Sequence, residues 1–341
     1  MGLLKCKLIL ALMILCKLTF AQQHYLLVLS KTEKKLIVLD YKTLDRVGSI
    51  AVGEDPHEVV TTTDGALAYV SIPLMNGNGH EIDVLDLKTL KPQKVIDTKP
   101  FYIPHGIVYQ QDKLWFTAQG SKSVVIYNTK EDQVEQVFGT GQDFTHLLYV
   151  TPDGRCFYTT NVESGTVSIY EKKDLPPYMP PTGVLPANAK PRLEWRQTLV
   201  NVGLGSEGFD VSPDGKELWT ARPDGHIVIV DLDKKKVKAE IDTKVLGLHR
   251  LKITPDGKTV CIVSVKTGDL LYYNMENHQL EQKDHIGQGA GIFMDKQTNR
   301  MFISCTPDSY VVVIDLATRR EIKHLNIGRP DGIAAVRVLN N

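Results

Sequence analysis

The chain has 341 residues, of which 42% are hydrophobic and 23% are charged, with 40 basic and 40 acidic side chains. This composition fits a globular protein with a sizeable core and excludes a disordered or fibrous chain. The balanced charge leaves no chain-wide basic surface, so general nucleic-acid binding is not expected.

The first 21 residues depart from this average. Lys5 and Lys7 precede the apolar run Leu8–Leu15, and Thr19-Phe20-Ala21 offers a small-x-small cleavage site. This order is typical of a secretory signal peptide. An apolar run of about eight residues is also too short to span a bilayer, which takes about 20. We therefore expect cleavage after Ala21 and a periplasmic or secreted protein without a transmembrane segment.

Cysteine usage adds two expectations. Cys16 suggests a lipoprotein anchor, but Leu15 stands where a small residue would be expected, so lipidation is discounted and stays open. Cys156, Cys261 and Cys305 remain after cleavage, each within an apolar, strand-like run. They are predicted to be buried small hydrophobes rather than a disulfide framework or a metal cluster. The loss of three leader lysines leaves 37 basic and 40 acidic residues, a net charge of −3.

One phrase then repeats along the chain: an apolar run, a Pro-Asp-Gly turn or its equivalent, a second apolar run, a polar loop and an alternating run that closes in an acidic or amide residue. Pro sets φ and Asp-Gly supplies a tight reversal, so each turn predicts a hairpin. The closing run occurs seven times, ending at Asp40, Asp86, Asn128, Glu171, Asp231, Asn274 and Asp315.

The spacings between these copies are 46, 42, 43, 60, 43 and 41 residues. A period slightly above 40 with four short strands predicts an all-β, seven-bladed β-propeller of four-stranded blades, in a single domain over residues 22–341. The first repeat begins directly with a second-strand phrase at Tyr25. Gly332–Val338 resembles the missing first strand, so the C-terminal segment should complete blade one and close the ring.

The repeats resemble the YVTN family of β-propellers, within the wider group that includes the cytochrome d1 haem domain and lactonase-like propellers. The likeness covers nearly all of the mature chain and is clearest in Val150–Tyr170 and Val211–Asp231. The turns of blades three and seven depart from the family phrase. Since the group includes binding proteins and enzymes, the resemblance implies the fold more than the activity.

In such a ring the first strands line a central channel, and their starting residues should meet at one face, here called the upper face. These seven strand-start residues share a place in the repeat and lie about 40 residues apart: His57, His105, His146, Glu207, His249, Ala290 or Gly291, and Asp331.

Four histidines and two acids among seven equivalent positions allow three readings. Imidazole and carboxylate are ligands for an unidentified divalent metal, for which we nominate His57, His105, His146, His249 and Glu207. His105, His249 and Glu207 are alternatively catalytic acid–base groups. The third reading is structural, with each imidazole bonded to the backbone of a neighbouring blade.

Loops between the second and third strands should rim the same face and add candidate ligand-binding residues. These candidates are Gln119, Asn161, Arg222, Lys266 and, in a longer glycine-rich loop, His80; Asp331 joins them from the strand starts. The arginine and lysine would suit a carboxylate or phosphate. Each of these charges is alternatively a solvated loop residue.

The largest insertion, Lys172–Arg196, joins the third and fourth strands of blade four and contains six prolines. We expect an irregular excursion that wraps the underside of the ring, with docking of a partner protein as the alternative.

Two function classes compete. The first is an enzyme of lactonase, lyase or isomerase type, metal-dependent, acting on a small oxygen-rich substrate. The second is a non-catalytic module that binds a glycan, peptide, nucleic acid or partner protein, with nucleic acid disfavoured by the charge. A noncovalent haem is a third option that the resemblance implies and that ranks below both, and the lack of a Cys-x-x-Cys-His motif argues against a covalent one.

Overall fold

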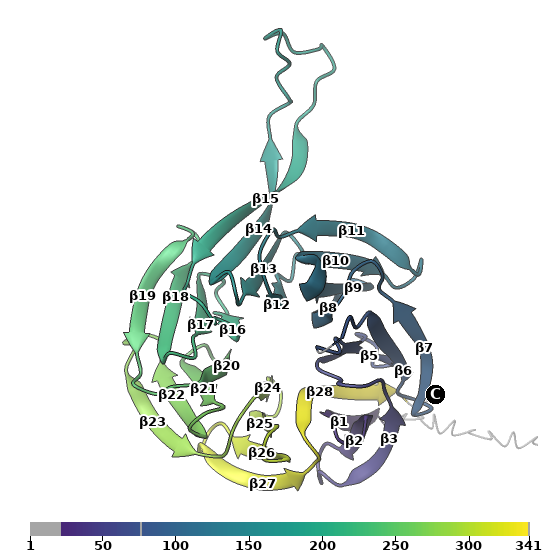
Figure 1. The fold of residues 1–341 in the computed structure, drawn as a ribbon, viewed down its shortest axis with the longest axis vertical. Helices are drawn as coiled ribbons and strands as arrows, with labels where there is room; N and C mark the ends of the chain where they lie inside the picture. The colour runs from purple at the N-terminus through teal and green to yellow at the C-terminus, as the bar shows by residue number, and fades with distance from the viewer. Residues whose placement is uncertain (1–21, 76, 340–341) are drawn as a thin grey trace, which may run out of the picture.

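A computed structural model describes residues 22–75 and 77–339 as a closed ring of seven four-stranded antiparallel sheets (Figure 1). The predicted seven-bladed β-propeller is confirmed. The predicted leader, including Cys16, lies outside the described residues. Within the described residues, no helix is both long enough and apolar enough to cross a membrane.

The strands of each blade run from the channel outward. Blade one holds β28 (Pro330–Leu339), β1 (Gln22–Ser30), β2 (Lys35–Asp40) and β3 (Arg46–Ala51). Blade two holds β4 (Val59–Thr61), β5 (Leu67–Ile72), β6 (Glu81–Asp86) and β7 (Lys91–Asp97). Blade three holds β8 (Pro104–Gln110), β9 (Lys113–Ala118), β10 (Ser123–Asn128) and β11 (Gln133–Gly139), with a 3-10 turn, η1 (Gln119–Ser121), after β9.

The second half of the ring repeats this order. Blade four holds β12 (Thr145–Val150), β13 (Cys156–Asn161), β14 (Thr166–Leu175) and β15 (Arg192–Asn201). Blade five holds β16 (Phe209–Val211), β17 (Glu217–Ala221), β18 (His226–Asp231) and β19 (Lys236–Asp242). Blade six holds β20 (Leu248–Ile253), β21 (Thr259–Ser264), β22 (Asp269–Asn274) and β23 (Leu280–His285). Blade seven holds β24 (Gly291–Asp295), β25 (Arg300–Cys305), β26 (Tyr310–Asp315) and β27 (Arg320–Asn326).

Ring closure follows the sequence prediction. β28 pairs antiparallel with β1, and Ala334 lies opposite Leu27 in the register. Each innermost strand also contacts the innermost strand of the next blade all the way round, including β24 with β28 and β28 with β4. The ends of the described chain therefore share one sheet, which leaves no open edge between blades one and seven.

Burial explains the pattern of the strands. The second and third strands of each blade are packed between two neighbouring blades, so they read as continuous apolar runs, as in β26. The core therefore lies between blades, where Leu27 and Leu36 of blade one pack with Val70 and Leu85 of blade two. The fourth strands form the outer edge and are mostly exposed, as in β11.

The predicted hairpin turns are present between the first and second strands. In blade four the amide of Gly154 donates to the carbonyl of Thr151 at 2.8 Å, while the Thr151 hydroxyl donates to Asp153 at 2.7 Å. Gly154 has a φ of +66°, which favours glycine at this position.

The Pro-rich insertion differs from the expectation. β14 and β15 continue as a paired hairpin to Leu175 and Arg192, and the segment projects outward from the ring (Figure 1). Trp195 packs against Phe138 and Phe157 at its base. The prediction that the insertion wraps the underside is wrong, because this extended pairing carries the chain away from the blade.

The three described cysteines are free thiols, as predicted. Cys261 and Cys305 are fully buried among apolar side chains and Cys156 is partly buried. Burial raises the pKa of the Cys305 thiol to about 12, so this group stays protonated and behaves as a small hydrophobe.

Candidate functional site

The seven strand-start residues line a single cavity of about 370 Å³, here called the upper cavity. The predicted convergence is therefore confirmed for His57, His105, His146, Glu207, His249, Ala290 and Asp331. Their individual roles stay predictions. The wall is completed by Lys31, Asp55, Met75, Phe144, Arg250, Thr306, Pro307 and Arg329.

Hydrogen bonds between blades fix the backbone of these residues. The Thr117 hydroxyl of blade three donates to the carbonyl of His146 at 2.6 Å, and the Thr160 hydroxyl of blade four donates to the carbonyl of Glu207 at 2.8 Å. Two further bonds of this kind run from the Gly208 amide to the carbonyl of His249 and from the Gly332 amide to the carbonyl of His57. The strand starts are thus held in place by the preceding blade.

Glycine is required where these strands approach most closely. A Cβ on Gly208 would lie 2.4 Å from the carbonyl oxygen of His249 and 2.6 Å from the Cα of Arg250. Gly106 and Gly332 occupy the same place in their blades and would clash with the backbones of His146 and His57. Close backbone packing therefore brings the imidazoles together around the channel.

Glu207 is the centre of the polar cluster. Its carboxylate lies 2.9 Å from Nε2 of His146, 3.1 Å from Nε2 of His249 and 3.8 Å from Arg250. Burial raises the pKa of Glu207, but His249 and His146 more than offset this and hold that pKa well below its ordinary value. Glu207 is therefore an ionised acceptor shared by two imidazoles.

The hydrogen bonds of His249 indicate its protonation state. Nε2 faces the Glu207 carboxylate, and Nδ1 lies 3.1 Å from the carbonyl oxygen of Ala290. Both partners are acceptors, so hydrogen on either ring nitrogen satisfies one of them, and the imidazolium form would satisfy both. His249 thus has the contacts of a proton donor paired with Glu207.

His105 and His146 have the opposite character. Burial, assisted by the neighbouring His146 and His57, lowers the pKa of His105 well below its ordinary value. Burial also lowers the pKa of His146, although Glu207 opposes the shift. The two rings lie with their centroids 3.9 Å apart, and Nδ1 of His105 is buried without a hydrogen-bond partner. Burial therefore favours the neutral form of both rings. Nδ1 of His105 is available to accept a proton, whereas the nitrogens of His146 face the side-chain oxygens of Glu207 and Gln119.

His57 belongs to a second polar group on the same wall. Its Nδ1 lies 3.2 Å from Asp331, and its Nε2 lies 3.6 Å from Asp55. Lys31 bridges the two carboxylates, at 2.5 Å from Asp55 and 3.0 Å from Asp331. Hydrogen bonding from His57, together with Lys31, lowers the pKa of Asp55. Lys31 offsets one of the two carboxylate charges, and His57 contacts both carboxylates.

The geometry does not fit a metal centre. Within residues 22–75 and 77–339, no three His, Cys, Asp or Glu side chains are arranged to hold a metal ion. The rings of His57, His105 and His146 lie against one another with centroids 4.6 and 3.9 Å apart, while His146 and His249 already contact Glu207. These rings pack against one another at tilts of 49° and 38° instead of surrounding a common point, so the metal site stays a prediction without a formed ligand set.

The loops after the second strands contribute less than predicted. Asn161 is fully buried and bonds to Thr145, Thr166 and Ser168, so its amide is used within blade four. Arg222 pairs with Asp224 and Glu240 at 3.0 and 2.7 Å. Neither residue lines the upper cavity, to which other loops of this kind contribute Lys31, Met75, Thr306 and Pro307, so ligand binding by Asn161 and Arg222 stays a prediction.

Three other predicted ligand-binding residues have separate places. Lys266 is exposed in an outer groove between blades six and seven, and His80 lies 3.0 Å from Asp97, so neither lines the upper cavity. Gln119 is buried at the start of η1, with its side-chain oxygen 3.3 Å from Nδ1 of His146. Gln119 therefore orients a cavity residue from behind.

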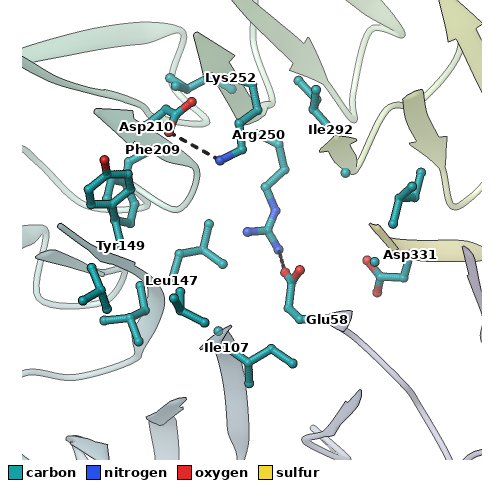
Figure 2. Close-up of a pocket in the computed structure, with 18 residues that line it drawn as sticks. Glu58, Ile107, Leu147, Tyr149, Phe209, Asp210, Arg250, Lys252, Ile292 and Asp331 are labelled. Carbon is teal, nitrogen blue, oxygen red and sulfur yellow. Dashed lines mark hydrogen bonds and ion pairs between the residues drawn. The ribbon is translucent and has the colours of Figure 1, made fainter. Parts of the chain in front are cut away.

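Arg250 and Glu58 were missed as site residues. They lie one position beyond the strand starts His249 and His57, and Arg250 Nη2 donates to Glu58 at 3.0 Å across the channel (Figure 2). Burial raises the pKa of Glu58 and Arg250 opposes this shift. The signal in the sequence was a pair of opposite charges at a repeat position where other blades carry glycine or leucine.

Beneath this ion pair lies a second cavity of about 340 Å³, here called the lower channel. Arg250 and Asp331 line both spaces, so the pair Arg250–Glu58 stands at their boundary. Figure 2 shows that apolar side chains from several blades face this space, among them Ile107, Leu147, Tyr149, Phe209 and Ile292.

Comparisons with known proteins place the chain by fold alone. No known protein family matches the sequence, and no curated protein matches it. Solved structures do match. A proposed 6-phosphogluconolactonase from Bacteroides fragilis NCTC 9343 superimposes with a TM-score of 0.72 at 13% identity, covering 93% of this chain and 99% of that one.

Two further structures extend this group. A functionally unknown protein from Desulfotomaculum acetoxidans DSM 771 has a TM-score of 0.70 at 13% identity, with 92% of this chain and 98% of that chain covered. The dihydro-haem d1 dehydrogenase NirN in complex with DHE has a TM-score of 0.61 at 13% identity, with 91% and 74% covered. The proposed lactonase and NirN correspond to the two kinds of propeller that the repeats resemble, and at such identities all three structures support the fold alone.

Proposed function

We propose that this protein is an enzyme that performs acid–base catalysis on a small, oxygen-rich substrate in the upper cavity, with lactone hydrolysis as the reaction to test first. One observation carries the proposal: both nitrogens of His249 face acceptors, the Glu207 carboxylate and the Ala290 carbonyl, whereas His105 is buried in the same cavity with a lowered pKa and an Nδ1 that has no partner. Neighbouring groups held in different protonation states supply an acid and a base at one pH.

In this reaction the neutral imidazole of His105 accepts a proton from water as the water oxygen bonds to the lactone carbonyl carbon. The ring C–O bond then breaks, and His249 donates its proton to the departing alkoxide. Glu207 stays ionised, holds His249 and His146 by hydrogen bonds, and stabilises the charge on His249. Elimination or isomerisation would use the same acid and base.

The charged residues of the wall constrain the substrate. Lys31, Arg250 and Arg329 balance Asp55, Glu207 and Asp331, so the cavity has no excess charge when its imidazoles are neutral. Arg329 is exposed at the rim and forms no ion pair with another described residue. A substrate carrying one carboxylate or phosphate would meet Arg329 at the mouth, with its neutral carbonyl end reaching the imidazoles.

A pH-indicator assay on a panel of sugar-derived lactones, with and without a phosphate group, tests the proposal. We expect turnover by the mature protein and a loss of at least 100-fold in kcat/KM for Glu207→Gln and for His249→Gln. Glu163→Gln, an exposed loop carboxylate, is the matched control and should keep full activity. If none of the lactones reacts faster with the wild type than with Glu207→Gln, hydrolysis of this class is ruled out.

The same preparation tests the alternatives. Stoichiometric metal that is lost in Glu207→Gln would replace the metal-free mechanism with the metal-dependent one predicted from the sequence. A visible absorption band would indicate haem. Saturable binding of a glycan or lactone without turnover would favour the non-catalytic binding module. The expected leader motivates the further proposal that the protein works in the periplasm or outside the cell, which fractionation of the expressing cells tests.

A further inference from the structure

The lower channel has the features of a second binding site, separate from the one on which the proposed function rests. Its volume of about 340 Å³ lies in the range of small-molecule pockets. It could hold roughly eleven waters, which a molecule of one or two rings would displace. Leu147, Tyr149, Ile292 and Ile333 line it and are only half-buried, so apolar surface from three blades faces the open channel.

The charges of the channel are already paired. Glu58 pairs with Arg250 at 3.0 Å, Asp210 with Lys252 at 3.4 Å, and Asp331 with Lys31 at 3.0 Å (Figure 2 shows the first two). Among the lining side chains three carboxylates face two cations. Because Lys31 pairs with Asp331, each of these carboxylates already has a cation, and a ligand ion of either sign would have to break an existing ion pair.

Arg250 has unused hydrogen-bond donors at the end of the lower channel that borders the upper cavity. A guanidinium carries five N–H donors. In the described residues Arg250 donates one hydrogen bond, to Glu58, and its next carboxylate, Glu207, is 3.8 Å away. Arg250 is 9% exposed, so spare donors there favour an acceptor from a ligand.

From the paired charges, the apolar wall and these donors, we propose that the lower channel binds a neutral, largely apolar molecule that places a carbonyl oxygen against Arg250. The rings or chain of the ligand pack between Leu147, Phe209 and Ile292, and the carbonyl accepts from the guanidinium. This site takes its ligand from the face opposite the upper cavity and does not depend on any reaction there.

The fluorescent neutral ketone prodan is a direct probe, because its emission shifts to the blue in apolar surroundings. We expect saturable binding to the mature protein with one site per chain. Ile292→Trp and, from another blade, Leu147→Trp fill the channel from half-buried positions and should each weaken binding at least tenfold. Thermal melts of both variants confirm folding before the titration.

Two control variants separate this site from other apolar surface. Met75→Trp narrows the upper cavity and should leave prodan binding unchanged. The double variant Tyr178→Ser/Val184→Ser removes side chains that are 67% and 71% exposed on the projecting hairpin and should also leave it unchanged. If either control abolishes binding while Ile292→Trp and Leu147→Trp do not, the proposed site is wrong.

Ligand chemistry is tested by displacing prodan with three molecules that share a phenyl-alkyl body: the ketone valerophenone, the anion phenylbutyrate and the cation phenylbutylamine. The ketone should displace prodan at concentrations at least tenfold lower than either ion. Arg250→Lys keeps the charge but loses the planar fork, so it should weaken valerophenone binding and spare the hydrocarbon pentylbenzene. Stronger displacement by an ion, or equal losses for ketone and hydrocarbon, would overturn the carbonyl assignment.

Discussion

The upper cavity and the lower channel are built from the same strands and differ in chemistry by one step along them. In blade four, β12 contributes His146 to the upper cavity and Leu147 to the lower channel. In blade six, His249 lies above, while Arg250 reaches both spaces. The comparison teaches that the residue at the start of each inner strand, within two positions of its first residue, sets the chemistry of the upper face, and that the residues after it set the chemistry of the channel.

Arg250 stands between the two regions, and its removal is the strongest test of their separation. Arg250→Met leaves Glu58 and Glu207 without their shared cation and should lower the free energy of unfolding by about 3–5 kcal/mol. Urea denaturation measures this change in the free energy of unfolding. Arg46→Met, in a surface ion pair with Glu33, is the control and should cost less than about 1 kcal/mol.

The double variant Arg250→Met/Glu58→Leu sharpens the result. It removes both partners of the boundary ion pair, so most of the lost stability should return. Equal losses in the single and double variants would show that the pair does not couple the two regions.

The walls of the upper cavity depend on close contact between the backbones of neighbouring blades, and a second substitution tests that contact. Gly208→Ala places a methyl group against the backbone of blade six and should cost about 2 kcal/mol. Gly139→Ala, at an outer-strand position with open space around it, should change stability by less than about 0.5 kcal/mol. If Gly208→Ala and Gly139→Ala changed thermal stability equally, the backbone around Gly208 would have to shift enough to accommodate the added methyl group.

The upper cavity should respond to pH more than the lower channel does. His105 and His146 have lowered pKa values when folded, so the unfolded chain binds more protons and stability falls as the pH drops from 7 to 5. Each histidine adds up to about 1.4 kcal/mol per pH unit. His105→Gln should flatten this slope, whereas His285→Gln, at an exposed site, should leave it unchanged. An unchanged slope in His105→Gln would mean that His105 is not held neutral.

The smallest expected effect concerns the bonds between blades. Thr160→Val removes the hydroxyl that donates to the carbonyl of Glu207 and should cost about 1 kcal/mol. Thr63→Val, on an exposed turn, is the matched control. A larger loss of catalytic rate than of stability would show that this bond positions Glu207.

Much of the fold could be predicted because each repeat marks equivalent positions in its blade. Seven closing runs fix the number of blades, and equivalence within the repeat brings His57, His105, His146 and His249 to one cavity although they are far apart in the chain. The closing strand also followed from a missing first strand. Periodicity therefore predicts both which residues share a level of the ring and how the ring closes.

Radial position could not be predicted in the same way. Asn161 and Arg222 occupy equivalent positions in their repeats, at which side chains were predicted to rim the upper face. Asn161 is instead buried within blade four, and Arg222 pairs with Asp224 and Glu240. The pairing of Arg250 with Glu58 spans 192 residues and depends on two side chains meeting across the channel. Such contacts follow from side-chain reach, which the repeat pattern does not encode.

The pairing of β28 with β1 also sets an order in time. During synthesis β1 emerges near the beginning, and its inner partner Pro330–Leu339 emerges some 300 residues later. Until then blade one lacks its inner strand, and β1 presents an unpaired apolar edge that includes Leu26 and Leu27. Blades two to six are able to form in sequence, whereas Asp331, and with it the full wall of the upper cavity, is added last. The complete upper cavity thus exists only in chains that have been made through to their closing strand.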